Sequence, residues 1–162
     1  MFRSLSTALV CMVAAAACAN AQSSGDTGSV TISGKVGRKS YESAGPGSCR
    51  HTANAAIYGV PAALWMVALT GSDDAAVKSV NLTLWKPKNG SPQQFSLSLD
   101  AGSSTHRIDV GGRGEQVGSG KATFAPKGAG GRIEISGKDD SGQVIELVVD
   151  CPAFAGVEAE GG

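Results

Sequence analysis

The cysteines constrain the fold of this chain more than any other feature of the sequence. Two of the four, Cys11 and Cys18, lie in an apolar N-terminal stretch, whereas Cys49 and Cys151 lie far apart in the remaining chain. An even pair of cysteines in an exported protein usually forms a disulfide. A metal or redox pair is disfavoured, because the chain has no CxxC motif and no histidine at a ligand-like spacing from both cysteines. We therefore predict a Cys49–Cys151 disulfide.

The N-terminus predicts export. Residues 1–21 contain one positive charge, then an apolar stretch from residue 5 to residue 17, then small residues that end at Ala21. This order is typical of a secretory signal peptide cleaved between Ala21 and Gln22. The apolar stretch is shorter than the roughly 20 residues that span a bilayer, so a transmembrane anchor is disfavoured. We expect an extracytoplasmic protein, either periplasmic or at the cell surface.

A second processing site remains open. Small residues precede Cys18, which is typical of lipoprotein cleavage, although the usual larger aliphatic residue three places earlier is replaced by Ala15. Cleavage there would remove residues 1–17 and leave Cys18 to carry a lipid. Each buried lipid methylene contributes about 0.8 kcal/mol of membrane affinity. The sequence therefore allows either a free protein beginning at Gln22 or one anchored through Cys18.

The composition narrows the class of protein. The chain has 14 Lys and Arg against 14 Asp and Glu, with no basic run, which argues against nucleic acid as a partner. It has 23 glycines in 162 residues, about twice the usual share of roughly 7%. Abundant glycine between short apolar segments is typical of a turn-rich all-β domain.

Alternating apolar residues predict short strands separated by turn residues. The clearest segments are 29–36, 77–85, 94–100, 105–110, 121–126, 131–138 and 143–150. The intervening stretches, including 43–48 and 111–120, are rich in Gly and Ser and are predicted loops. We expect a β-sandwich of about eight short antiparallel strands with one disulfide, or alternatively a small β-barrel.

The domain boundaries follow from the same pattern. We predict a flexible polar leader over 22–28, a single β domain over 29–151 and a disordered tail over 152–162.

The apolar segment 53–69 has two interpretations. A helix beginning at Pro61 is compatible with AALWMVAL, whereas two strands joined by a turn at Gly59–Pro61 fit the content of Ile, Tyr, Val and Trp. We favour two strands. In either case the predicted core residues of this segment are Trp65, Met66, Val67 and Leu69.

Candidate sites are few. Tyr58, Trp65 and Trp85 could line a face that binds a hydrophobic ligand or a glycan, although tryptophan more often belongs to a core. His51 and His106 are expected at the surface or in structural roles, because the chain has no GxSxG or HExxH motif.

The remaining motifs do not predict cofactors. The acid pairs 73–74 and 139–140 fall in predicted turns and lack the spacing of a calcium loop. The glycine-rich stretch 111–123 departs from a phosphate-binding loop at Glu115 and Ala122. No cofactor and no metal are therefore expected.

The order of several segments resembles a known family. SVTISGK, the Ser48–Cys49 pair, AIYGVPAALWMVAL, DDAAVKSVNL, GGRIEISGKDDSG and IELVVDC follow one another over roughly residues 29–151. This order resembles the mycobacterial surface lipoprotein antigens of the LpqH type. The resemblance implies a lipid-anchored, β-rich, non-enzymatic protein with one disulfide between cysteines placed like Cys49 and Cys151, and an acylated Cys18. The segment 86–120 matches that pattern less well.

The sequence therefore predicts a non-catalytic exported β domain that acts as an interaction or antigen-type module for an unidentified protein. The alternative is a domain that binds a small hydrophobic ligand or a glycan near Trp65 and Trp85. A less favoured alternative is a hydrolase, which would require His51 or His106 to lie in a cleft beside an acid.

Overall fold

The computed structural model describes residues 28–112 and 114–157. The predicted cleavage site between Ala21 and Gln22 and the predicted lipidation at Cys18 lie outside these ranges, as do residues 22–27 of the predicted leader. The described residues contain no helix that is long and apolar enough to cross a membrane.

The fold is all-β, as predicted. The strands in chain order are β1 (Ser29–Val36), β2 (Lys39–Ile57), β3 (Val60–Thr70), β4 (Val77–Pro87), β5 (Gln94–Ala101), β6 (Ser104–Val110), β7 (Ser119–Lys127), β8 (Gly130–Lys138), β9 (Val144–Cys151) and β10 (Ala155–Gly156). The main sheet has the order β6-β5-β4-β3-β2-β1-β9-β8-β7, with antiparallel neighbours throughout. The short β10 pairs in parallel with β2.

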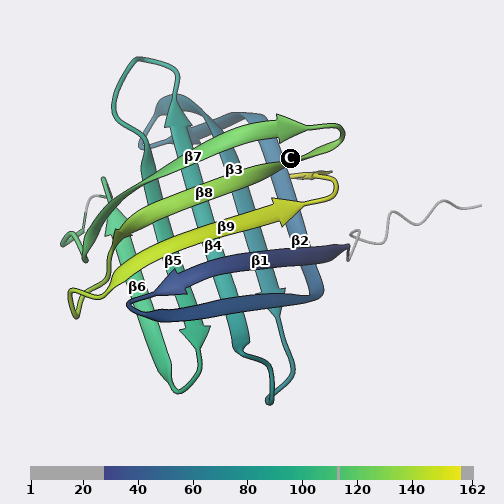
Figure 1. Cartoon of the computed structure of the whole chain (residues 1–162). Coiled ribbons are helices and arrows are strands. Elements are labelled where there is room, and N and C mark those ends of the chain that lie inside the picture. The colour runs from purple at the N-terminus through teal and green to yellow at the C-terminus, as the bar shows by residue number, and fades with distance from the viewer. Residues whose placement is uncertain (1–27, 113, 158–162) are drawn as a thin grey trace, which may run out of the picture.

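The sheet folds over on itself into two layers (Figure 1). The layer of β1, β9, β8 and β7 lies across the layer of β3, β4, β5 and β6, and β2 takes part in both. The first part of β2 pairs with β1 as far as Pro46, and from Gly47 onward it pairs with β3. The sheet therefore nearly closes into a barrel, so that the predicted sandwich and the alternative barrel describe the same arrangement.

The core lies between the two layers. Period-2 alternation points every second side chain inward, which explains why the strand pattern was visible in the sequence. Large apolar side chains that are almost completely buried come from both layers: Ile32, Leu82, Leu97, Leu99, Ile108, Ile133, Ile145 and Val149. Burial of one such side chain stabilises the fold by about 1.5–3 kcal/mol.

The interpretation of 53–69 as two strands is confirmed. Strands β2 and β3 are joined by a turn at Tyr58 and Gly59, and both residues have positive φ. The core prediction was right for Trp65, Val67 and Leu69 but wrong for Met66, which is 40% exposed. Met66 follows Trp65 in an extended strand, so it points to the opposite face of the sheet.

The predicted loop over 43–48 was wrong, because this stretch lies inside β2. It is the part of β2 where the strand passes from one layer to the other. A Cβ on Gly47 would lie 2.5 Å from the carbonyl oxygen of Ala68 and 2.7 Å from a methyl carbon of Val30. The glycine therefore permits a close approach of chain segments, rather than a loop.

The predicted disordered tail was wrong for residues 152–157, whereas residues 158–162 lie outside the described part of the chain. Past Cys151 the chain runs to β10, which pairs with Arg50 and His51 of β2. Phe154 packs against the core and contacts the ring of Phe124 edge-on, with 5.7 Å between ring centroids. This packing orders a segment that has no strand periodicity of its own.

Candidate functional site

The disulfide is present as predicted. Cys49 in β2 and Cys151 at the end of β9 are bonded, with their Cα atoms 6.1 Å apart and 102 residues between them in the sequence. The bond therefore connects the two layers where β2 leaves one and enters the other. Persistent disulfides occur mainly in oxidising compartments, so this bond is compatible with an extracytoplasmic location.

The structure separates Trp65 from Tyr58 and Trp85, the other two aromatic residues proposed as a ligand face. Trp65 is 6% exposed and lies in the core, where it stacks on His51 at 4.7 Å between ring centroids and contacts Phe124 at 4.8 Å. Its indole N–H has no hydrogen-bond partner within the described residues. Trp65 is therefore a packing residue.

Tyr58 and Trp85 do come together. They line a hollow of about 160 Å³ on the outer face of β4 and β5, together with Gln94 and Asp109. Tyr58 is 51% exposed and Trp85 is half-buried. Typical ligand pockets measure about 300–1,000 Å³, so this hollow suits only a small group.

His51 has a structural role, as predicted. Its Nδ1–H donates to the carbonyl oxygen of Leu64 at 2.8 Å, and its ring is held between Trp65 and Phe154. These aromatic contacts, together with the disulfide, fasten the segment around Phe154 to β2 and β3.

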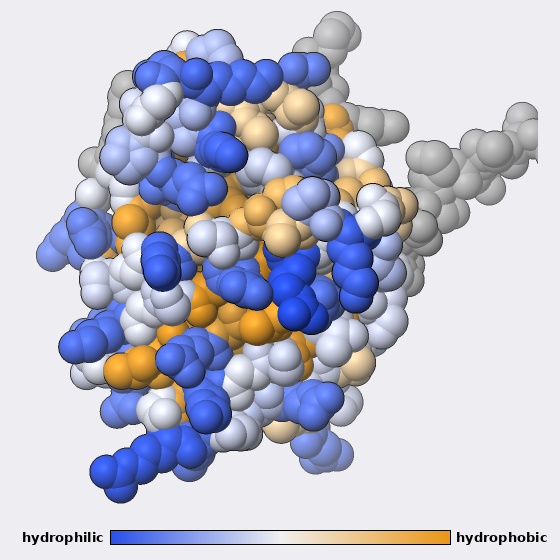
Figure 2. All heavy atoms as spheres, turned by 45° about the horizontal axis from the view of Figure 1, so that its top comes forward, coloured by the Kyte–Doolittle hydropathy of each residue, from blue (hydrophilic) through white to orange (hydrophobic). Residues whose placement is uncertain are grey.

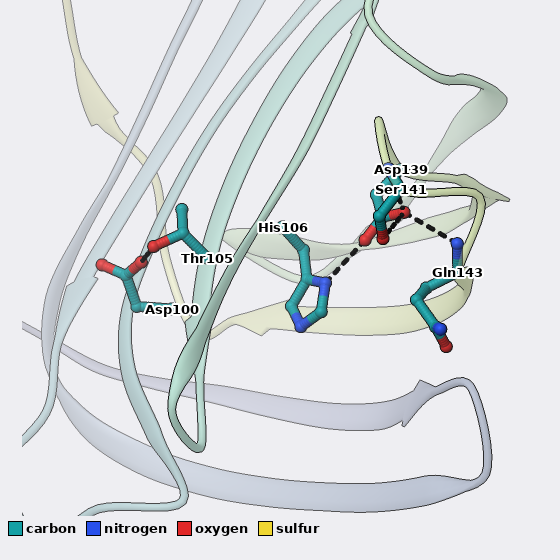
Figure 3. A network of polar contacts seen from close by, with 6 residues as sticks. All are labelled: Asp100, Thr105, His106, Asp139, Ser141 and Gln143. Atoms are coloured by element: carbon teal, nitrogen blue, oxygen red, sulfur yellow. Dashed lines mark hydrogen bonds and ion pairs between the residues drawn. The ribbon is translucent and has the colours of Figure 1, made fainter.

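His106 is buried against an acid, which the sequence did not predict. It is 8% exposed, and its Nδ1 donates to Asp139 Oδ2 at 2.6 Å (Figure 3). Asp139 is 3% exposed and lies in the turn between β8 and β9. The alternation of His106 with Ile108 and Val110 was the available signal, because it places the histidine on the inward face of β6.

Asp139 is saturated with hydrogen bonds. Besides the imidazole, it accepts from the backbone N–H groups of Ser141 at 2.9 Å and Gln143 at 2.7 Å, and from the Ser141 hydroxyl at 2.8 Å. Burial alone would raise the pKa of Asp139, but the hydrogen bonds from His106, Ser141 and Gln143 outweigh burial, and its pKa lies below the ordinary 3.8. The acid therefore stays ionised near neutral pH and fixes both its own turn and the imidazole ring.

Ser141 does not complete a Ser-His-Asp catalytic triad with His106 and Asp139. Ser141 donates its hydroxyl to Asp139 rather than lying against the other nitrogen of the imidazole. The catalytic triad requires the serine on the side of the histidine away from the acid. The geometry is instead that of a buried, oriented histidine.

A hollow opens beside this histidine. It measures about 970 Å³, and three turns supply its rim: β1–β2, β5–β6 and β8–β9. The side chains that line it include Arg38, Lys39, Ser104, His106 and Asp140.

A second hollow runs across the outer face of the layer formed by β1, β9 and β8, with parts of β2 and β7. We call it the outer groove; it measures about 1,090 Å³. Figure 2, which views this layer obliquely from above, shows an apolar strip framed by hydrophilic side chains. Its lining includes Gly34, which has no side chain, and the small side chains of Ser33 and Ser136, whereas Val148 adds apolar surface.

Charges of both signs frame the outer groove: Lys35, Lys121, Glu42, Glu134 and Glu146. The ion pairs found among the described residues are His106–Asp139 and Arg132–Asp150, so none of these five charges is paired within 4.0 Å. Even Lys35 and Glu146, which are direct neighbours across β1 and β9, remain apart. None of these five side chains is therefore held in an ion pair with another described residue.

Within residues 28–112 and 114–157, no group of three or more His, Cys, Asp or Glu side chains is placed to hold a metal ion. Comparisons with protein-family profiles, with curated proteins and with solved structures find no match for this chain.

Proposed function

We propose that this chain is an exported, non-catalytic binding module that holds a polar segment of a protein partner in the outer groove. The observation that carries the proposal is the set of unpaired lysines and glutamates around a floor of small residues on one face of the sheet. Side chains of both signs complement a peptide that offers ammonium, guanidinium and carboxylate groups. The interior is packed with apolar side chains, so a partner would bind to the outside of the sheet.

Site-specific crosslinking tests this proposal. A photoreactive amino acid is placed at Ser136 in the groove and, as a matched control, at Ser98 on the outer face of the other layer; both serines are half-buried strand residues. Crosslinking is done in the native cell envelope. We expect a discrete protein adduct from position 136 that is lost with Glu134→Lys, and none from position 98. Equal adducts from both positions, or none from either, would contradict the proposal.

Export and attachment form part of the same proposal. Either Gln22 begins the mature chain or an acylated Cys18 anchors it in a membrane, as in the LpqH-type lipoproteins whose sequence order it resembles. In the anchored form, residues 22–28 would separate the domain from the membrane. The intact mass of protein taken from its native membrane fraction distinguishes the two, because a diacylglycerol-modified Cys18 and a chain beginning at Gln22 differ in mass.

A second candidate function is supported by the shared hollow of Tyr58 and Trp85, which could stack on one ring of a glycan or a flat hydrophobic group. Trp65 is buried, so Trp85 is the tryptophan expected to report binding. Fluorescence titration with glycans and fatty acids should then shift the emission of the wild type but not of Trp85→Phe. A flat titration of the wild type excludes this candidate.

A further inference from the structure

The hollow beside His106 has features of a binding site that its structural role does not explain. It lies where the turns β1–β2, β5–β6 and β8–β9 meet, whereas the outer groove crosses the middle of β1, β9 and β8; Tyr41 lines both hollows. Its volume of about 970 Å³ is within the range of small-molecule sites.

The floor of this hollow holds an oriented imidazole. Nδ1 of His106 is engaged with Asp139, and Figure 3 shows the second ring nitrogen, Nε2, pointing away from that acid. The side chain is 11% exposed, and the residue is among those that line the hollow. Because Asp139 receives the Nδ1 proton, a protonated ring would present an Nε2–H donor to a ligand, with its positive charge offset by the acid behind it.

The rim favours an anion with a single charge. Arg38 and Lys39 come from the first turn and its following strand, and neither forms an ion pair within the described residues. Asp140 is the acid among the side chains that line the hollow, so the rim carries one net positive charge. The ionised Asp139 behind the ring opposes a doubly charged ligand. The balance of charge therefore suits a carboxylate better than a phosphate dianion.

Hydroxyl groups complete the lining. Ser103 and Ser104 lie at the β5–β6 turn, whereas Thr105 donates its hydroxyl to Asp100 at 2.6 Å. Two serine hydroxyls beside a cation and an oriented imidazole can hydrogen-bond the neutral part of a small polar acid.

We propose that this hollow binds a small ligand through a carboxylate, which contacts Nε2–H of His106 and the guanidinium of Arg38. The carboxylate could belong to an acidic sugar or to the C-terminus of a peptide, because both present the same planar monoanion. Arg38 is exposed in a turn, whereas Asp139 fixes His106, so the ligand would bridge an exposed guanidinium and a protonated imidazole of fixed orientation.

Imidazole NMR tests the proposal on the intact mature domain at pH 6. The probes are acetate, glucuronate and N-acetylalanine, with sulfate, a dianion at this pH, as the comparison. We expect a saturable shift of the His106 ring nitrogens and no shift of His51, which serves as the control within the same spectrum. Preference for glucuronate indicates an acidic sugar, and preference for N-acetylalanine indicates a peptide terminus.

Matched variants sharpen the test. Arg38→Gln should weaken carboxylate binding about tenfold, as expected for the loss of a charge-assisted hydrogen bond. Arg50→Gln, at an exposed arginine on β2 outside the hollow, should leave the affinity unchanged. The proposal would be overturned by the absence of a saturable shift with any carboxylate, by equal shifts at His51, or by tighter binding of sulfate. Unchanged affinity in Arg38→Gln would do so as well.

Discussion

The two junctions between the layers are held in different ways. At one junction β2 runs from layer to layer as unbroken backbone, and the Cys49–Cys151 bond joins it to β9. At the other, which we call the β6–β7 seam, Asp109 of β6 forms an isolated β-bridge with Val117, which lies just before β7. There the His106–Asp139 pair links β6 to the β8–β9 turn.

Close packing also brings the seam together. Gly120 of β7 and Gly137 of β8 are partners across the two strands. A Cβ on Gly137 would lie 3.1 Å from Ile108 Cδ1, and one on Gly120 would lie 3.4 Å from Phe95 Cζ. One junction is therefore covalent, whereas the other depends on side-chain fit and the buried His106–Asp139 hydrogen bond. The comparison indicates that the seam is the weaker junction and the place where the barrel should open first.

Removal of the covalent junction should have the largest effect. Cys49→Ser or Cys151→Ser is expected to lower the free energy of unfolding by about 4 kcal/mol, because the bond closes a loop of about a hundred residues in the unfolded chain. Urea unfolding measures the change. The double variant Cys49→Ser/Cys151→Ser should lose no more than either single variant, and a loss below about 1 kcal/mol would contradict this account.

Disruption of the His106–Asp139 hydrogen bond at the seam should have the next largest effect. Asp139→Asn leaves a buried imidazole and a turn without their anionic acceptor, so we expect a loss of about 2–3 kcal/mol in the free energy of unfolding. Asp140→Asn is the matched control, because Asp140 is the exposed neighbour in the same turn. Its expected change is within about 0.5 kcal/mol. Similar losses from the two variants would show that the pair does not hold the seam.

Lowering the pH should also reduce the free energy of unfolding that the seam contributes. The pKa of Asp139 is lowered by folding, so its contribution is fully present above its ordinary value of 3.8 and is lost as the pH falls through the lowered folded value. Urea midpoints measured from pH 6 down to pH 2.5 should therefore fall in the wild type. The fall should be shallower in Asp139→Asn.

A second carboxyl provides a comparison for this pH dependence. Hydrogen bonds from Ser79 and Thr105 lower the pKa of Asp100, which is less buried than Asp139. Asp100→Asn should therefore flatten the acid-side slope less than Asp139→Asn does. If Asp100→Asn flattened the slope more than Asp139→Asn, the acid sensitivity would arise outside the seam.

The smallest effect is expected at an exposed ion pair away from both junctions. Arg132 and Asp150 make two parallel hydrogen bonds of 3.0 Å across β8 and β9. Such pairs contribute about 0–1 kcal/mol, so Arg132→Gln should change the urea midpoint only slightly. If Arg132→Gln lost as much stability as Asp139→Asn, burial of the His106–Asp139 pair would not explain its larger contribution.

The sequence predicted the elements held by local alternation. Segments such as 94–100 and 131–138 show period-2 burial, and each became a strand within a residue or so of the predicted bounds. The disulfide was predictable because two cysteines remained outside the predicted export signal. The alternation of apolar residues and the number of cysteines can both be read from the sequence without the tertiary structure.

The seam and the hollows were not predictable in this way. His106 and Asp139 are 33 residues apart and meet only because the sheet folds over. The stretch 43–48 has the composition of a loop, yet pairing with β1 and β3 makes it strand. The outer groove likewise combines side chains from five strands, and no short motif encodes such a grouping.

Native-state hydrogen exchange of Asp139→Asn against the wild type tests the difference between the junctions most directly. Amide protection should fall most in β6 and β7, while amides of β2 and β9 beside the disulfide keep more of theirs. A uniform loss of protection across all strands, or a loss concentrated at β2 and β9, would contradict this prediction.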